Sequence, residues 1–309
     1  MSRNERQTVS YLNRRFREVG LEPNKRHGQN FLVDLNLVRL IEASGDIQPN
    51  DVVLEVGTGT GSLTGMLAEK ACKVVTVEID EHLYQLASEE LERFDNILML
   101  RQDALKNKNK LSDKVLEPLM ELVNEEPGRQ FKLIANLPYN VATPIISNLL
   151  LLDTPPAMMS VTIQKELGDR MMAKPSTKDY SALSIWMQAL CEIQMIRVLP
   201  PGVFWPAPKV DSAIMQIRHI PEKRANIHDL PFFHKFTRAL FFHRRKFLRS
   251  VVISAFKETM NKQDVDSVLD QLDFYSSNTR AEELPVEQIL IMSEAFATKQ
   301  KEVVAAILK

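Results

Sequence analysis

The segment from residue 51 to residue 79 constrains the fold more than any other part of the chain. A continuous apolar run, Val52 to Val56, is followed by a glycine-rich turn, a stretch with helical periodicity, Leu63 to Lys70, and a second β-branched run, Val74 to Ile79. This is the pattern of a βαβ unit, and strands that are apolar on both faces are typical of a parallel sheet buried between helices. The segment therefore predicts an α/β fold.

Other apolar runs extend this sheet and show where it ends. Further strands are predicted at residues 97–100, 132–135, 158–163 and 191–198. We predict a Rossmann-like, mostly parallel, doubly wound domain over residues 31–217, preceded by a basic segment, residues 1–30. After residue 218 only helical periodicity remains, which predicts a small all-helical domain over residues 218–309. The polar stretch 106–130, with Pro127-Gly128 near its end, is interpreted as an insertion without a chemical role.

Composition excludes several classes of protein. The 309 residues are 44% hydrophobic and 26% charged, which is enough apolar material for a large core and a smaller one. No apolar stretch reaches the roughly 18 residues of a membrane span, and the N-terminus is polar where a signal peptide is apolar. The two cysteines, Cys72 and Cys191, are too few for a disulfide framework or a metal-ligand cluster. We therefore expect a cytoplasmic protein without a metal or a membrane partner.

The net charge of −1 conceals an uneven distribution of charge along the chain. Residues 1–30 contain seven Lys and Arg against three acidic residues, and residues 218–250 contain nine against two. The remainder of the chain is therefore acidic. Segregation of this kind is typical of contact with a nucleic-acid backbone, although two solvated basic helices would produce the same pattern.

The glycine turn Gly57-Thr58-Gly59-Thr60-Gly61 lies between a strand and a helix, where open α/β sheets bind nucleotide-like ligands. Its G-x-G-x-G spacing is not the G-x-G-x-x-G of pyrophosphate binders, and Glu55 before it would repel a diphosphate and favour an ammonium group. Glu78 ends the next strand, where a carboxylate accepts hydrogen bonds from ribose hydroxyls. Asp103 follows the strand after that and could accept an adenine amino group.

A ligand with ribose, adenine and an ammonium group but no phosphate is S-adenosylmethionine (AdoMet). Each of the three acidic residues alone is as readily a helix N-cap or a solvated loop residue. Their common position around one glycine turn favours an AdoMet-dependent methyltransferase, with a nicotinamide-dependent enzyme as the main competitor.

A second motif, Asn136-Leu137-Pro138-Tyr139, follows the strand at 132–135 and is predicted at the same sheet edge. An exocyclic nucleobase amine is a poor nucleophile because its lone pair is delocalised into the ring. If the Asn136 side-chain oxygen and the Leu137 carbonyl each accept one N–H, the lone pair is directed at the methyl group and no strong base is required. Pro138 fixes φ, and Tyr139 can stack on a flipped base. In isolation the motif is equally a tight turn with a core tyrosine.

Taken together, the motifs resemble the KsgA family of ribosomal RNA adenine N6,N6-dimethyltransferases, from about residue 25 to residue 280. The resemblance rests on residues 25–32, 55–61, 77–80, 102–104, 136–140, 164–166, 204–212 and 242–246. Two features depart from the family pattern. His27 replaces a residue that is usually aromatic, and the 106–130 stretch is longer than usual. The mechanism above needs no general base, so His27 is given no role.

The resemblance implies a set of site residues and a substrate. The implied AdoMet contacts are Asn30, Leu32, Gly57, Gly59, Glu78, Asp103 and Asn136. Residues 136–139 would hold the target adenine, Phe204 would close over the other face of that base, and Gln29-Asn30 would fold over the cofactor as a lid. The implied substrate is a pair of adjacent adenines in the 3′-terminal hairpin loop of small-subunit (16S) rRNA within a pre-30S particle, each receiving two methyl groups during small-subunit biogenesis.

The basic residues of the C-terminal region are predicted to bind RNA phosphates: Lys235, Arg238, Arg244, Arg245, Lys246 and Arg249. Nothing in the sequence requires more than a monomer. Two alternatives remain open: a large-subunit rRNA adenine N6-methyltransferase of the erythromycin-resistance type, and a non-catalytic assembly or transcription factor on the same scaffold. The 136–139 motif and the basic cluster at 244–246 favour the small-subunit enzyme, and intact Glu78, Asp103 and Asn136 argue against lost catalysis.

Overall fold

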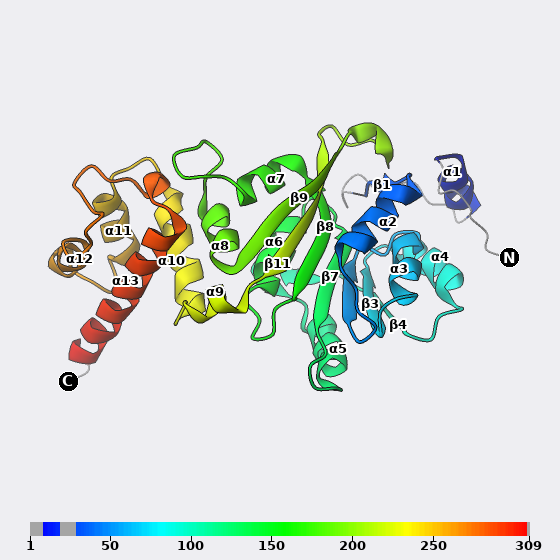
Figure 1. Cartoon of the computed structure of the whole chain (residues 1–309), viewed down its shortest axis with the longest axis horizontal. Coiled ribbons are helices and arrows are strands. Elements are labelled where there is room, and N and C mark those ends of the chain that lie inside the picture. Colours follow the sequence, from blue (N-terminus) through cyan, green and yellow to red (C-terminus); the bar gives the residue numbers. More distant parts are fainter. Residues whose placement is uncertain (1–8, 19–28, 308–309) are drawn as a thin grey trace. The chain divides into compact units, whose positions relative to one another are not determined.

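The computed structural model describes residues 9–18 and 29–307, and the chain forms two compact units (Figure 1). The first unit comprises the chain up to Gly168 together with Gln194–His219, and the second comprises Asp169–Ile193 and the chain from Ile220 onward. The boundary predicted at residues 217 and 218 lies close to His219. The segment Asp169–Ile193, which the sequence pattern assigned to the first domain, groups instead with the helices of the second unit.

A seven-stranded sheet with the order β4-β3-β2-β7-β8-β11-β9 forms the centre of the first unit. Its strands are β2 (Val52–Val56), β3 (Lys73–Glu78), β4 (Ile97–Arg101), β7 (Phe131–Asn136), β8 (Met158–Gln164), β9 (Cys191–Leu199) and β11 (Ser212–His219). The first five strands of that order pair in parallel, and β11 is antiparallel to β8. All predicted strands are present. The strand β11 was not predicted, and it lies between β8 and β9.

Helices cover the sheet and explain why its central strands are apolar throughout. They are α2 (Leu35–Ser44), α3 (Ser62–Ala68), α4 (Glu81–Leu91), α5 (Asp113–Asn124), α6 (Ala142–Leu149) and α7 (Lys165–Met171). Helix α2 contacts β7 and β8, α3 contacts β3, and α4 contacts β3 and β4. Every residue of β2 is buried, as expected for a strand covered on both faces.

The polar stretch 106–130 is part of the fold, which corrects its interpretation as an insertion. It contains most of a short hairpin, β5 (Leu105–Asn107) and β6 (Lys110–Leu111), followed by α5. Helix α5 buries Val115, Leu119 and Val123, four residues apart, and contacts β2 and β3. It is therefore the crossover helix between β4 and β7, which parallel strands require.

The N-terminal part of the first unit adds a helix and a two-stranded sheet. Helix α1 (Val9–Glu18) precedes strand β1 (Phe31–Leu32), which pairs antiparallel with β10 (Phe204–Trp205). A short 3₁₀ helix, Pro201–Val203, precedes β10. Helix α1 buries Leu12 and Phe16 in a cluster with Phe31, Leu83 and Leu86, which ties it to β1 and α4.

The second unit is helical, as predicted, and its C-terminal helices run from yellow to red in Figure 1. They are α8 (Ala182–Leu190), α9 (Pro221–Ala225), α10 (Leu230–Phe242), α11 (Leu248–Phe256), α12 (Lys262–Leu269), a 3₁₀ turn (Ala281–Glu283) and α13 (Val286–Ile307). Phe236, Phe256 and Phe296 pack together at its centre, with ring centroids 5.1–6.0 Å apart. Helix α8 packs against α10 and α13, so Asp169–Ile193 belongs to this core. Among the described helices, none is long and apolar enough to cross a membrane.

Candidate active site

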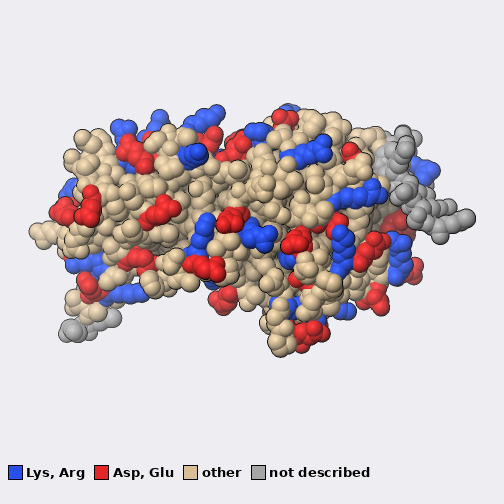
Figure 2. Space-filling view, viewed as in Figure 1, with Lys and Arg blue, Asp and Glu red and all other residues tan. Residues whose placement is uncertain are grey.

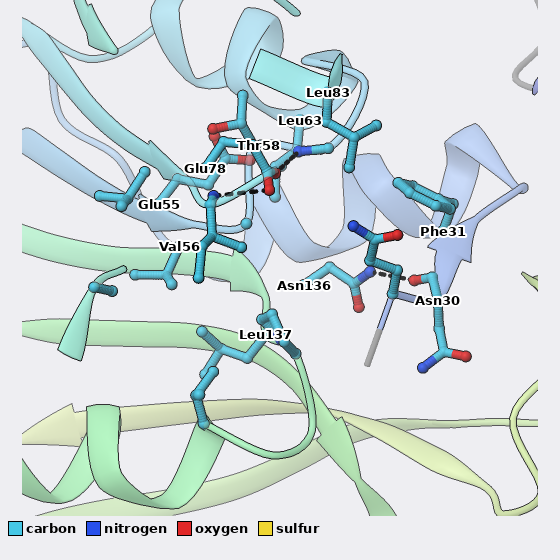
Figure 3. A pocket seen from close by; sticks show the side chains of 18 of the residues that line it. Asn30, Phe31, Glu55, Val56, Thr58, Leu63, Glu78, Leu83, Asn136 and Leu137 are labelled. Atoms are coloured by element: carbon cyan, nitrogen blue, oxygen red, sulfur yellow. Dashed lines mark hydrogen bonds between the residues drawn. The ribbon is translucent and has the colours of Figure 1, made fainter. Parts of the chain in front are cut away.

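A cavity of about 280 Å³ opens at the carboxyl ends of β2, β3 and β7, next to β1 (Figure 3). This edge is the switch point of the sheet, where strand order reverses and where α/β proteins bind ligands. All seven residues predicted to contact the cofactor line the cavity: Asn30, Leu32, Gly57, Gly59, Glu78, Asp103 and Asn136. Leu137, Pro138 and Tyr139 line it too. The first predicted motif residues, 25–28 with His27, lie outside the described residues.

The glycine turn has a backbone conformation that explains its three glycines. Gly57, Gly59 and Gly61 have φ of 88°, 58° and 79°, in the region that glycine adopts without strain. The turn folds back on the protein. The N–H groups of Gly57 and Thr58 donate to the Val77 carbonyl at 2.8 and 3.3 Å, and the Gly61 N–H donates to the Thr58 carbonyl at 3.0 Å. These donors are therefore not available to cradle a diphosphate, which disfavours a dinucleotide ligand.

Glu78 is fixed at the end of β3 by three backbone donors. Its Oε2 accepts from the Gly59 N–H at 2.9 Å, and its Oε1 accepts from the N–H groups of Ile79 and Asp80, also at 2.9 Å. Burial raises the pKa of the Glu78 carboxyl, and these three hydrogen bonds oppose that rise. Both lone pairs of Oε1 are thereby engaged, whereas Oε2 keeps one lone pair for a further donor such as a ribose hydroxyl.

The sequence predicted that the Glu55 carboxylate attracts an ammonium group of the ligand, but in the structure this side chain is buried and hydrogen-bonded within the protein. Its side chain is 1% exposed, and its Oε2 accepts from the hydroxyls of Thr64 and Thr76 at 2.6 and 2.7 Å. Thr58 and Thr76 share a further hydroxyl hydrogen bond of 2.7 Å, so Glu55 holds the glycine turn to β3. Burial raises the pKa of Glu55 to about 8, so the carboxyl is mostly protonated at neutral pH. It therefore supplies little of the negative charge that was expected to attract an ammonium group.

Asp103 follows β4 and is exposed at the rim of the cavity. Its Oδ1 accepts from the Leu105 N–H at 2.8 Å, which fixes the carboxylate. The other oxygen, Oδ2, is available to a ligand amino group. Glu78 and Asp103 are thus acceptors at two neighbouring strand ends, as predicted.

The Asn136 side chain is held in one orientation. Its Nδ2 donates to the Asn30 carbonyl at 2.9 Å, a bond that joins β7 to the segment before β1 (Figure 3). The Nδ2 group is therefore engaged, and Oδ1 is the atom that remains to accept a hydrogen bond. The next carbonyl, that of Leu137, receives no donor from the described residues, and Pro138 has no N–H. Two acceptor oxygens therefore occur on consecutive residues.

Tyr139 and Ser212 form a pair that the sequence did not reveal. The Tyr139 hydroxyl lies 2.5 Å from Ser212 Oγ, which is fully buried at the start of β11. Burial raises the pKa of Tyr139, so the phenol stays protonated at neutral pH. The hydrogen bond fixes the ring at the cavity wall. Because β11 was not predicted, nothing in the sequence placed Ser212 near residue 139.

The structure does not bring Phe204 to the cavity. Its side chain is 3% exposed and packs in a core cluster with Leu32, Leu37 and Ile41. Phe204 pairs with Leu32 in the small sheet, so its role in this structure is to support β1. Phe31 was missed, although it lines the cavity. A Cβ built on Gly59 would lie 3.4 Å from its ring, so Phe31 covers the glycine turn.

The predicted phosphate-binding residues fall into two groups. Arg244 donates to the Tyr180 carbonyl at 2.5 Å and pairs with Glu282 at 3.5 Å, and Arg249 forms a two-bond ion pair with Asp266 at 2.6 and 2.7 Å. The other four are exposed and form no ion pair with any described residue: Lys235, Arg238, Arg245 and Lys246. On the face shown in Figure 2, basic and acidic side chains are interspersed. No group of acidic, His and Cys side chains within the described residues could hold a metal ion.

Comparison with known proteins decides the family. The model of the family described as "Ribosomal RNA adenine dimethylase" matches residues 20–298. The chain belongs to this family. The chain is similar to two proteins named ribosomal RNA small subunit methyltransferase A. That of Clostridium acetobutylicum is 36% identical over 94% of this chain and 97% of its own length, and that of Lactiplantibacillus plantarum is 39% identical over 90% and 91%.

Solved structures confirm the fold of this adenine dimethylase. A dimethyladenosine transferase from Plasmodium falciparum superposes with a TM-score of 0.70 at 24% identity, covering 85% of this chain and 96% of that one. The 23S rRNA methyltransferase ErmE superposes with a TM-score of 0.59 at 24% identity, covering 87% and 100%. The predicted Rossmann-like methyltransferase fold with a helical C-terminal region is therefore confirmed, and so is the predicted family.

Proposed function

We propose that this chain transfers methyl groups from AdoMet to N6 of two adjacent adenines in the 3′-terminal hairpin loop of small-subunit (16S) rRNA, two to each adenine. Membership of the adenine dimethylase family defines the reaction class. The observation that carries the proposal is the fixed Asn136 amide, whose Oδ1 and the neighbouring Leu137 carbonyl present two acceptors at the cavity edge. An exocyclic amine has two N–H groups, so two acceptors match it.

The cavity supports AdoMet as the cofactor. Four backbone N–H groups of the glycine turn, those of Gly57, Thr58, Gly59 and Gly61, are bonded within the protein, so they are not available as the anion-binding donors of a dinucleotide site. Oε2 of Glu78 and Oδ2 of Asp103 instead suit a ribose hydroxyl and an adenine amino group. In the proposed complex, Asn30, Leu32, Gly57, Gly59 and Asn136 complete the contacts, and Gln29 and Phe31 cover the site. AdoMet, when bound, supplies an electrophilic methyl group on its sulfonium.

The side chains act on the target amine by position. Asn136 Oδ1 and the Leu137 carbonyl each accept one N–H, which directs the nitrogen lone pair away from both acceptors. Tyr139, held by Ser212, offers a ring on which the extruded adenine stacks. As the C–N bond forms, the methyl–sulfonium bond would break and S-adenosylhomocysteine would be the leaving group. The proton would pass to water only after the nitrogen has become acidic, so the site needs no strong base. Phe204 is not part of this proposal because it is buried in the core.

The small-subunit substrate is favoured over the two alternatives. The relatives at 36–39% identity are named as small-subunit methyltransferases, whereas the 23S rRNA methyltransferase shares the fold at 24% identity. The complete cavity argues against a non-catalytic factor. On this proposal the chain works in the cytoplasm as a monomer on a pre-30S particle. Lys235, Arg238, Arg245 and Lys246 contact RNA phosphates there.

A methylation assay on both ribosomal subunits tests the proposal. Purified protein, radiolabelled AdoMet and subunits from cells without N6,N6-dimethyladenosine are combined, and the labelled RNA is analysed by mass spectrometry. We expect two dimethylated adenines in 16S rRNA and no label in 23S rRNA. Label in 23S rRNA alone would establish the erythromycin-resistance alternative. Absence of AdoMet binding in calorimetry would establish the non-catalytic one.

A further inference from the structure

The most exposed large apolar side chain in the described residues is Phe242, at the end of α10. It is 80% exposed, whereas every other phenylalanine of α10 packs into the second unit. Phe233 contacts Trp186, Phe232 and Phe236 contact Phe256, and Phe241 contacts Tyr180. Among the aromatic rings of the described residues, the ring of Phe242 is paired with that of His243, edge to face, with centroids 4.7 Å apart. The helix therefore does not need Phe242 for its packing.

The charges around Phe242 show what kind of surface this is. Lys235, Arg238 and Phe242 are spaced three and four residues apart, so they form one exposed stripe along α10. Arg245 and Lys246 follow in the turn to α11 and are exposed as well. Lys235, Arg238, Arg245 and Lys246 form no ion pair with any described residue, so their four positive charges are available to a ligand. The stripe thus joins one bare aromatic ring to four cations.

We propose that this stripe is a second RNA-binding site, which takes an unpaired base on the ring of Phe242 and the adjoining phosphates on the four cations. The inference rests on the proposed function, because that function supplies an RNA partner. Stacking on an aromatic ring and phosphate neutralisation by nearby Lys and Arg are together the means by which proteins bind unpaired nucleotides. An apolar protein partner fits less well, because it would bury four cations without counter-charges.

The cations already account for affinity to any RNA backbone, and Phe242 adds selection of an unstacked base. The site is separate in sequence from the cavity residues, all of which belong to the first unit. The RNA is therefore recognised at two places: the target adenine at the cavity and a second unpaired base on α10. A regular duplex offers no free base face and would gain nothing from Phe242.

The test uses full-length protein and small ribosomal subunits whose 16S rRNA lacks N6,N6-dimethyladenosine, with binding measured against salt concentration. Phe242→Leu keeps most of the apolar area but removes the ring, and we expect about tenfold weaker binding with an unchanged salt dependence. Phe242→Trp should bind at least as tightly as the wild type. Ile291→Ala is the matched control: Ile291 is 56% exposed on α13, between Glu287 and Glu294, and its loss should change nothing.

Unchanged affinity of Phe242→Leu would overturn the inference, and so would equal weakening by Leu and Trp, since either result means that the ring does not stack. Because Phe242 is exposed, thermal unfolding should be the same for all variants, and this is measured alongside. If the proposed function is wrong, the wild-type protein will transfer no methyl group to these subunits, and this result is distinct from an unchanged affinity of Phe242→Leu. If the wild type methylates and Phe242→Leu binds normally, the inference alone fails.

Discussion

The orientation of a single amide determines whether the site can act on an amine. Asn136 Nδ2 is engaged by the Asn30 carbonyl, so Oδ1 is the acceptor that remains. We predict that Asn136→Ala lowers the single-turnover rate of methyl transfer about 100-fold or more, a loss typical for removal of one preorganised hydrogen-bonding group. The affinity for small subunits should stay near that of the wild type, because the RNA contacts proposed on α10 are intact. Equal losses of binding and rate would contradict this role.

Glu55 makes the stability of the first unit depend on pH. Burial raises its pKa to about 8, whereas the unfolded chain has the ordinary value near 4.5, so the folded state binds the extra proton between these two values. The free energy of unfolding therefore falls as pH rises from about 4.5 to 8, by up to about 1.4 kcal/mol per pH unit. Below this window the contribution of Glu55 is constant.

The variant Glu55→Gln tests this dependence, because glutamine resembles the protonated carboxyl and its oxygen can accept from Thr64 and Thr76. We predict that the variant matches the wild type at pH 5 and unfolds at a higher temperature at pH 8. Glu78 has a raised pKa and titrates in both proteins, so the difference between them isolates Glu55. A variant that loses stability equally at both pH values would show that the carboxyl is ionised in the folded protein.

At the level of elements, α1 supports the segment that covers the cavity. The family model begins at residue 20, so α1 precedes the matched region, yet Phe16 is buried and contacts Phe31 and Trp205 at 5.0 and 5.5 Å between ring centroids. Phe31 in turn covers the glycine turn. We predict that Phe16→Ala weakens AdoMet binding several-fold in calorimetry, because β1 loses one side of its support. Val9→Ala, on the exposed face of the same helix, should bind like the wild type.

Helix α5 gives a separate prediction for the stretch that looked like an insertion. Leu119 is fully buried against the central strands, so Leu119→Ala should cost about 2–5 kcal/mol of unfolding free energy, measured by denaturant titration. Glu121→Ala on the exposed side is the control. A dispensable insertion would tolerate both changes equally well.

The sequence predicted those elements whose pattern is local. The five parallel strands were found because their apolar runs are continuous, and Glu78, Asp103 and Asn136 because each ends or follows a strand. Asn30 and Leu32 were implied only by the family resemblance. Helix α5 was missed because Pro118 lies inside it, where proline normally breaks a helix. The strand β11 was missed because its continuous apolar run, residues 213–215, is short and is flanked by polar residues. Its neighbours β8 and β9 precede it in the chain, so only the tertiary fold brings Ser212 to Tyr139.

Local charge counts were a weaker guide, because they do not show which charges are already paired. Six basic residues were predicted to bind phosphates, but Arg244 and Arg249 are held by Glu282 and Asp266 of their own unit. The buried position of Phe204 is another tertiary effect. The family motif implied that the Phe204 ring closes over the target base. Instead, the pairing of β10 with β1 places this ring in the core.

At the scale of the whole molecule, the near-neutral net charge means that RNA binding depends on a few unpaired cations and not on the total charge. Under the proposed function, Arg245→Gln combined with Lys246→Gln removes about two phosphate contacts. The slope of log affinity against log salt for unmethylated small subunits should therefore decrease by about 1.5, with AdoMet affinity unchanged. Arg249→Gln is the matched control, because its guanidinium is occupied by Asp266, and it should lower the unfolding temperature without changing the slope. The opposite result, a smaller slope for Arg249→Gln and an unchanged slope for the double variant, would contradict this prediction. It would mean that the Arg249–Asp266 ion pair breaks when RNA binds and that the RNA contacts lie toward α12.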